Sequence, residues 1–245
     1  MTETRTPTVI VDQLHVKYRV YASGKPLGAK ESSRRRVRGI REVHALKGLS
    51  FSVYEGESIG VIGHNGSGKS TLMRSIAGLE PAAGGAVYAA SKPALLGVNA
   101  ALLPSLSGEK NVQLGALALG FTKDEVEQKA DEIVDFSGIG DFIELPMRAY
   151  SSGMQQRLKF AIAIAKSHQI LLVDEALSVG DRDFRNRSEA RIRAMREDAG
   201  TVFLVSHSMD SILDTCTRVI WLDHGTLKMD GDPREVCDAY SASVA

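Results

Sequence analysis

A glycine-rich stretch followed by a lysine and two hydroxyl residues has the clearest chemical pattern in the sequence. It consists of Gly63, His64, Asn65, Gly66, Ser67, Gly68, Lys69, Ser70 and Thr71, in the spacing G-x-x-x-x-G-K-[ST]. Glycines allow several backbone N–H groups to point at one anion, and the N-terminus of a following helix adds partial positive charge. We predict a phosphate-binding loop in which Lys69 bridges the β- and γ-phosphates of a nucleotide and Ser70 helps to hold Mg²⁺.

Two adjacent carboxylates, Asp174 and Glu175, follow the apolar run "ILLV". In an open α/β sheet, polar residues at the carboxyl ends of strands reach the crevice where ligands bind. We therefore predict that Asp174 holds Mg²⁺, directly or through water, and that Glu175 orients or activates an attacking water. The alternative is that both acids only cap the next helix, and the phosphate loop upstream favours the catalytic interpretation.

A histidine, His207, ends another apolar run, "TVFLVSH". A lone histidine is commonly an ordinary core or surface residue. Here we expect it at the same sheet edge as the two carboxylates, where its ring can donate a hydrogen bond to the γ-phosphate.

The elements that position these residues follow from local patterns. Residues 8–20 alternate apolar and polar residues, which is typical of an edge strand, and residues 21–43 form an insertion rich in Gly, Pro, Ser and Arg. A second strand follows the insertion, with a hairpin turn near Glu55 and Gly56. We expect a frayed tail at the C-terminus, in "DAYSASVA".

Helices alternate with short β-rich runs in the rest of the chain. One predicted helix begins at Ser70 and is closed by Gly78 and Pro81, and another runs from a capping box at Thr122 and Glu125 to Gly138. The β-rich runs are 170–175, 201–207 and 218–225. This alternation predicts a largely parallel sheet that is covered on both faces.

The composition is that of an ordinary soluble globular protein. Of the 245 residues, 43% are hydrophobic and 24% are charged, and the 30 basic residues balance the 30 acidic ones, which gives no argument for nucleic-acid binding. Two cysteines, Cys216 and Cys237, have no metal-site spacing, and we expect reduced thiols. The N-terminus lacks a secretion-signal pattern, and no run reaches the roughly 18 apolar residues that span a bilayer. Any function at a membrane therefore needs a partner.

Five motifs occur in an order that resembles the ATP-binding cassette, the ATPase subunit of ABC transporters. They are the phosphate loop, the turn "YSSGM" at residues 150–154, the strand "ILLVDE", the loop "SVGD" and the "SH" after the last core strand. The resemblance covers residues 8 to about 240. It implies an α/β P-loop NTPase fold with a mostly parallel core sheet, an N-terminal antiparallel β subdomain and an α-helical subdomain.

The resemblance also implies how a single domain over residues 1–245 is divided. A RecA-like core with the antiparallel part takes residues 8–96 and 166–235, the helical subdomain takes 97–165, and a tail takes 236–245. No C-terminal carbohydrate-binding domain is expected.

Cassettes of this family work as head-to-tail dimers, and the resemblance assigns residues on that basis. Each ATP lies between the phosphate loop of one subunit and the signature turn of the other, here residues 150–154. Ser151 corresponds to the serine that meets the γ-phosphate, with Ser152 and Gly153 beside it, and Asp181 joins the nucleotide-binding set. The turn departs from the usual Leu-Ser-Gly-Gly-Gln at Ser152 and Met154.

The resemblance leaves two positions open. The loop that usually carries a glutamine near Mg²⁺ has none before Pro104, and Asn99 is the nearest amide. The aromatic residue that stacks on adenine is either Tyr18 or His44, and ordinary strand packing is the alternative for each.

The turn "YSSGM", together with "DEALSVGD" and "VSHSMDSI", resembles the cassettes of polysaccharide exporters. This implies ATP hydrolysis that drives a lipid-linked polysaccharide of galactan, O-antigen, capsule or teichoic-acid type across the cytoplasmic membrane. The implied partners are a second cassette and a separate integral-membrane permease in two copies, which place the chain at the cytoplasmic face of the inner membrane. Another exported cargo and a non-transport ATPase are the alternatives.

A cluster of arginines lies inside the 21–43 insertion: Arg34, Arg35, Arg36, Arg38 and Arg41. A solvated loop is the simplest interpretation. Attraction to anionic headgroups, or binding of a lipid-linked pyrophosphate by guanidinium groups, is the functional hypothesis.

Overall fold

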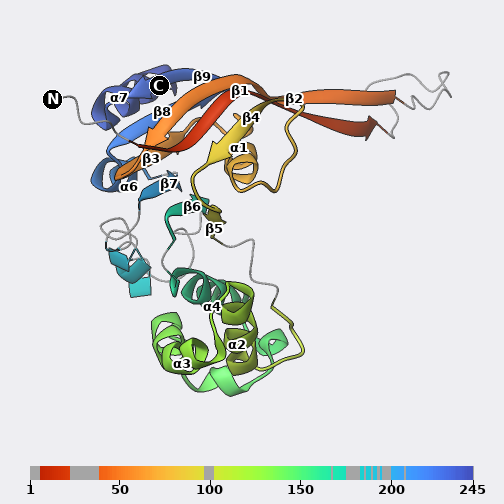
Figure 1. Ribbon diagram of the computed structural model, residues 1–245, viewed down its shortest axis with the longest axis vertical. Coiled ribbons are helices and arrows are strands. Elements are labelled where there is room, and N and C mark those ends of the chain that lie inside the picture. Colours follow the sequence, from red (N-terminus) through yellow and green to blue (C-terminus); the bar gives the residue numbers. More distant parts are fainter. Residues whose placement is uncertain are drawn as a thin grey trace.

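The computed structural model describes most of the chain (Figure 1). The described residues are 6–22, 39–96, 102–166, 168–174, 183–184, 186–188, 190–191, 194, 200–206 and 208–244. Four of the predicted site residues, Glu175, His207, Asp181 and Asn99, lie outside these ranges, as do Arg34, Arg35, Arg36 and Arg38.

A six-stranded sheet forms the centre of the molecule. Its strand order is β5-β6-β7-β3-β8-β9, and every neighbouring pair is parallel except the antiparallel pair of β8 and β9. The strands are β3 (Glu57–Ile62), β5 (Ala94–Leu95), β6 (Ile170–Asp174), β7 (Thr201–Val205), β8 (Arg218–Asp223) and β9 (Thr226–Gly231). The expected largely parallel sheet is confirmed.

Both faces of this sheet are buried, which explains its continuous apolar runs. In β6, Ile170 and Leu172 belong to one core cluster, whereas Leu171 and Val173 belong to the other. Successive side chains of a strand point to opposite faces, so an apolar strand without alternation needs cover on both sides. The first cluster includes residues of helix α1 (Lys69–Ile76), and the second includes residues of α6 (Met209–Thr215) and α7 (Pro233–Val244).

A three-stranded antiparallel sheet packs over the first cluster. It consists of β1 (Pro7–Ala22), β2 (Gly39–Tyr54) and β4 (Gly84–Ala89), in the order β2-β1-β4. The expectation of an edge strand at residues 8–20 is therefore wrong, because β1 pairs with both neighbours. The alternation of Val9, Val11 and Val16 with polar residues indicates that one face of the strand is buried. It does not indicate how many neighbouring strands form hydrogen bonds with it.

The 21–43 insertion is shorter than expected. Residues 18–22 of β1 pair with residues 39–43 of β2, and in Figure 1 these distal ends project from the body as a two-stranded arm. Val20 and Val43 are 49% and 43% exposed, and Arg19 contacts Glu42 at 3.7 Å. A ribbon exposed to solvent leaves no burial pattern in the sequence, so its composition was misleading. Arg41 lies on this arm and is exposed.

The turn at Glu55 and Gly56 joins two different sheets and is not a hairpin turn. The strand before it, β2, pairs with β1, whereas the strand after it, β3, pairs with β7 and β8. The N–H of Gly56 donates to the carbonyl of Gly200, at the start of β7. Turn residues indicate a reversal of the chain, but the pairing partners are set by tertiary packing.

Three helices form a separate layer with its own core. They are α2 (Gly108–Ala118), α3 (Lys123–Ser137) and α4 (Ser152–Ile164). Two short 3₁₀ helices, Gly140–Glu144 and Met147–Ala149, lie between α3 and α4. The predicted capping box is confirmed, since Glu125 N donates to Thr122 Oγ1 at 3.3 Å and Thr122 N donates to Glu125 Oε2 at 2.6 Å. Gly138 ends α3 with φ 60°. In Figure 1 this layer lies at one end of the molecule, beyond β5 and β6, whereas α1 lies among the strands.

The C-terminal segment is a helix and not a frayed tail. Helix α7 runs to Val244, buries Val236 and Cys237 and stacks Tyr240 edge-on against Trp221 with 5.4 Å between ring centroids. Its many Ala and Ser residues conceal this amphipathic pattern. Both cysteines are buried, no disulfide joins them, and burial raises the pKa of the Cys237 thiol. Among the described residues, no helix is long and apolar enough to cross a bilayer.

Arg218 of β8 makes four hydrogen bonds, three to carboxylates of its own sheet and one to the antiparallel sheet. Its guanidinium donates to both carboxylate oxygens of Asp230 at 2.6 and 2.7 Å, to Glu57 Oε2 at 3.2 Å and to the Ser52 carbonyl at 2.9 Å. We expect Arg218→Ala to lower the free energy of unfolding by about 2–4 kcal/mol, because it leaves two largely buried carboxylates without their cation. Urea unfolding measures this change. The exposed Arg148→Ala is the control, with an expected change below about 0.5 kcal/mol, and an equal loss in both variants would contradict the role of Arg218.

Candidate nucleotide-binding site

The phosphate loop, residues 63–71, connects the central strand β3 to helix α1. Gly63 and Gly68 have φ values of 144° and 109°, which side chains rarely adopt. A Cβ at Gly63 would also collide with the carbonyl oxygen of Leu222, and one at Gly68 would lie 2.8 Å from Leu46 Cδ2. Backbone geometry therefore favours glycine at both positions, and the contact with a backbone oxygen excludes a side chain at Gly63.

Lys69 directs its ammonium group into this loop. The side chain is only 6% exposed, and Nζ donates to the carbonyls of Gly63 at 2.7 Å and His64 at 3.0 Å. Ser67 Oγ is buried and has no hydrogen-bond partner in the described part of the chain. A phosphate group would supply acceptors for both side chains, so the loop fits an anionic ligand.

A cavity of about 720 Å³ opens beside the phosphate loop. This volume is in the usual range of about 300–1,000 Å³ for small-molecule sites. The lining residues come from the loop, from the antiparallel sheet and from the β8–β9 turn: Tyr18, Val43, His44, Ala45, Lys47, Asn65, Gly66, Gly68, Lys69, Ser70, Thr71 and His224. The structure thus brings both predicted aromatic residues to the phosphate loop.

Tyr18 and His44 reach the cavity from adjacent strands. Tyr18 Oη lies 3.5 Å from Thr71 Oγ1, and the ring of His44 lies 5.7 Å from that of His15. Desolvation, followed by electrostatic repulsion from nearby basic residues, first Lys17, lowers the pKa of His44. A neutral imidazole at pH 7 is suited to stacking on a base, so both residues stay candidates for adenine contact.

We expect the stacking residue to be identified by Tyr18→Ala and His44→Ala. Loss of base stacking costs about 1–3 kcal/mol, or about 5- to 150-fold in affinity for ATP. Calorimetry with ATP and with inorganic tripolyphosphate separates base contact from phosphate contact. In the variant that lacks the stacking residue, binding of ATP should weaken and binding of tripolyphosphate should not. The control is Tyr88→Ala, at a side chain on β4 that is 59% exposed, and it should change the affinity for neither ligand. Equal weakening for both ligands would exclude stacking.

Oxygen ligands for a metal ion lie at the same edge of the sheet. Asp174 pairs with Val205, and Val205 pairs with Val61, so the end of β6 is aligned with the end of the strand that leads into the phosphate loop. Asp174 is half-buried, and Ser70 lies exposed in the first turn of α1. Carboxylate and hydroxyl oxygens beside a phosphate loop suit Mg²⁺, so these residues fit the predicted ion.

The signature turn lies away from this cavity. Ser151 is the N-cap of α4, and its Oγ accepts from Met154 N at 3.2 Å. Ser151 and Ser152 are exposed and Gly153 is half-buried, whereas Tyr150 is buried and donates from its hydroxyl to the Phe142 carbonyl at 2.7 Å. None of these residues lines the cavity, so the described chain does not bring the turn to its own phosphate loop.

Sequence reasoning missed several cavity residues. Lys47 and His224 line it, from β2 and from the turn after β8. A signal for His224 was present, because β8 is an apolar strand that ends in "DHG" and runs parallel to the strand before the phosphate loop. Lys47 had no comparable signal, since its strand belongs to the other sheet.

The fold and the site together define a nucleotide-binding domain of the ATP-binding-cassette class. A phosphate loop at the edge of a parallel sheet, an antiparallel sheet that brings aromatic side chains to the cavity, and a helical layer with a serine-capped turn are the parts of such a domain. The family model described as ABC transporter matches residues 46–178, and the chain belongs to this family.

Curated relatives agree with this assignment. The teichoic acids export ATP-binding protein TagH of Enterococcus faecalis is 41% identical over 198 residues, which cover 81% of this chain and 44% of that protein. The protein of the same name from Staphylococcus saprophyticus is 34% identical over 240 residues, which cover 95% of this chain and 88% of that protein. The chain spans between 40% and 44% of the length of several of these relatives.

A solved structure confirms the expected fold class. The ATP-binding cassette MJ0796, as a dimer in a post-hydrolysis state bound to ADP and Pi, aligns with a TM-score of 0.74 and 22% identity. The alignment covers 92% of this chain and 99% of that one.

Proposed function

We propose that this chain hydrolyses ATP to drive export of a lipid-linked polysaccharide through a separate membrane permease. The observation that carries the proposal is the buried Lys69 inside a phosphate loop that opens on a cavity with two aromatic side chains. Relatives at 34–41% identity that are named for teichoic acid export support a polymer of this chemical class as the cargo.

Binding of the triphosphate uses groups that are already in place. The ammonium of Lys69 exchanges the carbonyls of Gly63 and His64 for phosphate oxygens, and the Ser67 hydroxyl gains an acceptor. The adenine lies towards Tyr18 and His44, which line the same cavity. Ser70 and Asp174 would hold Mg²⁺, which supplies charge neutralisation at the phosphate oxygens when bound.

Hydrolysis requires a positioned water and stabilisation of charge on the γ-phosphate. Glu175 accepts a proton as the water oxygen attacks the γ-phosphorus, and the bond to the bridging oxygen breaks to give ADP and phosphate. His207 donates a hydrogen bond to a γ-phosphate oxygen. Asp181 contributes to nucleotide binding. Asn99 takes the role near Mg²⁺ that a glutamine usually has in this family.

A second copy of the chain completes each site in this proposal. Ser151, Ser152 and Gly153 are exposed or half-buried, and the N-terminus of α4 carries partial positive charge worth about 0.3–2 kcal/mol to a nearby anion. A turn of this kind, distant from the phosphate loop of its own chain, is suited to the γ-phosphate held by a partner. MJ0796, which has the same fold, is dimeric.

We expect Ser151→Asp to abolish ATP-dependent dimerisation while ATP binding to the monomer stays within about twofold. Aspartate caps helices as well as serine does, so α4 is retained, but its charge repels the γ-phosphate. Analytical ultracentrifugation with ATP, in a Glu175→Gln background, measures the effect. Ser105→Asp, at an exposed serine of the same layer, should dimerise normally, and normal dimerisation of Ser151→Asp would contradict the shared site.

The cargo and partners are tested in the native cell. In the proposal, two permease copies hold the cassette pair at the cytoplasmic face of the inner membrane. Depletion of the chain should cause a lipid-linked polymer to accumulate in the cytoplasmic leaflet, and a Lys69→Ala copy should fail to restore export. Unchanged export on depletion, or accumulation of a different solute, would overturn the assigned cargo.

A further inference from the structure

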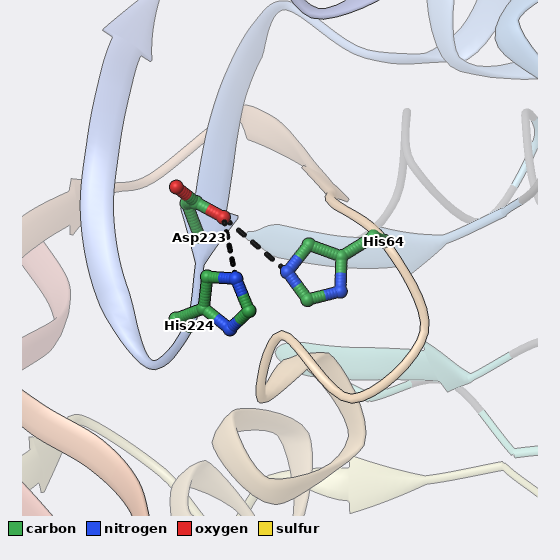
Figure 2. A group of neighbouring side chains, drawn as sticks. All are labelled: His64, Asp223 and His224. Atoms are coloured by element: carbon green, nitrogen blue, oxygen red, sulfur yellow. Dashed lines mark ion pairs between the residues drawn. The ribbon is translucent and has the colours of Figure 1, made fainter. Parts of the chain in front are cut away.

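Three possible metal ligands meet at the base of the phosphate loop (Figure 2). His64 belongs to the loop, Asp223 ends β8, and His224 begins the turn to β9. One ligand atom from each residue lies within 4.8 Å of the other two. The shortest separations are 3.3 Å from His64 Nε2 to Asp223 Oδ1 and 3.9 Å from His224 Nε2 to the same oxygen.

The hydrogen bonding of His64 indicates a place for a cation between its imidazole ring and the carboxylate of Asp223. Nδ1 lies 2.7 Å from the Asn65 carbonyl oxygen. A carbonyl only accepts, so Nδ1 must carry the proton, and in a neutral ring Nε2 then has a lone pair. Nε2 is buried without a hydrogen-bond partner in the described part of the chain, although it faces Asp223 Oδ1. Two lone pairs at this distance are stabilised by a cation between them.

We propose that His64 Nε2, Asp223 Oδ1 and His224 Nε2 bind a late first-row transition metal ion of the Zn²⁺ type. Two imidazoles and one carboxylate suit Zn²⁺, Co²⁺ or Ni²⁺, whereas Mg²⁺ prefers oxygen ligands. Bonds of about 2.0–2.2 Å in a tetrahedral site separate ligand atoms by about 3.3–3.6 Å. The 3.3 Å between His64 Nε2 and Asp223 Oδ1 matches this separation, and the exposed ring of His224, at 3.9 Å, would move slightly closer on binding. Water takes the fourth position.

The surroundings match those of metal ligands. A histidine that binds a metal usually donates its other ring N–H to a carbonyl or carboxylate, as His64 does to Asn65. The second oxygen of Asp223 faces Lys228 Nζ at 3.6 Å, which leaves Oδ1 directed towards the two rings. These rings lie 4.5 Å apart, and His224 adopts a φ of 47°.

A metal ion at this site would cross-link the phosphate loop to the β8–β9 turn. His224 also lines the nucleotide cavity, so the ion lies at the edge of that cavity. The ligands are different from Ser70 and Asp174, the residues that fit Mg²⁺. The inference rests on the described side chains alone and does not depend on ATP hydrolysis or on the cargo.

The test uses the full chain without a histidine tag and without nucleotide. Zn²⁺ affinity is measured in a metal buffer, and Co²⁺ serves as a spectroscopic probe of tetrahedral ligation. We expect one ion per chain, and a loss of at least about tenfold in affinity for Asp223→Asn and for His224→Asn. Asparagine is chosen at position 224 because it tolerates a left-handed backbone. His168→Gln should bind as the wild type does.

Two outcomes would overturn the proposal. One is no saturable binding of Zn²⁺ or Co²⁺, which would show that only a proton joins His64 to Asp223. The other is binding that survives in Asp223→Asn and His224→Asn but is lost in His44→Gln, which would move the site to the His15–His44 pair.

Discussion

Lys69→Ala is expected to lower ATP hydrolysis by about 10³-fold and to weaken ATP binding in parallel. Removal of one preorganised donor to developing charge costs about 10²–10³ in rate, and Lys69 also supplies the buried positive charge of the loop. The variant has no ammonium group to exchange the Gly63 and His64 carbonyls for phosphate oxygens. Release of phosphate from ATP and calorimetric titration measure the two effects.

Lys92→Ala is the matched control for this variant. Lys92 is exposed in the connection between β4 and β5, and its removal should leave hydrolysis unchanged. Circular dichroism verifies that both variants are folded. Hydrolysis by Lys69→Ala at more than a tenth of the wild-type rate would show that the phosphate loop is not the catalytic site.

Glu175→Gln is expected to reduce turnover by about 10²–10⁴-fold, the usual contribution of a general base. An amide cannot accept the proton of the attacking water, but it has nearly the same shape, so ATP affinity should be retained. A dimer stabilised by ATP should therefore accumulate, and gel filtration with ATP detects it. Glu127→Gln, at an exposed residue of α3, is the control.

The assignment of Glu175 rests on its neighbour. Asp174 ends β6 in register with the strand before the phosphate loop, and Glu175 is the next residue in the sequence. If Glu175→Gln hydrolysed ATP at a near-normal rate, the general base would have to be another residue. Binding lost together with turnover would instead indicate a structural role.

Features that depend on local sequence were predictable. The phosphate loop follows from glycine spacing, the capping box of α3 from Thr122 and Glu125, and the parallel sheet from apolar runs such as "ILLV". Each of these patterns reflects backbone geometry or burial within a short segment. The position of Asp174 beside the loop also followed, because the carboxyl ends of parallel strands share one edge.

Features that depend on pairing between distant segments were not predictable. The alternation in β1 gave its buried face but not its two neighbours, and the turn at Gly56 did not reveal that it joins two sheets. Val20 and Val43 of the arm of β1 and β2 are exposed, so burial left no pattern there to detect, and the Ala and Ser residues of α7 concealed its contacts with Trp221. The meeting of His64 with Asp223 likewise needs the packed structure.

The position of β3 has a consequence for biosynthesis. Within the described residues, this strand, which leads into the phosphate loop, pairs with β7 and β8, from the C-terminal third of the sequence. Contacts of such long sequence separation form late, because the intervening chain must first be made and closed into a loop. A nascent chain on the ribosome therefore has the residues of its phosphate loop long before it has the strands that hold them. We expect nucleotide binding to appear only after β8 has emerged.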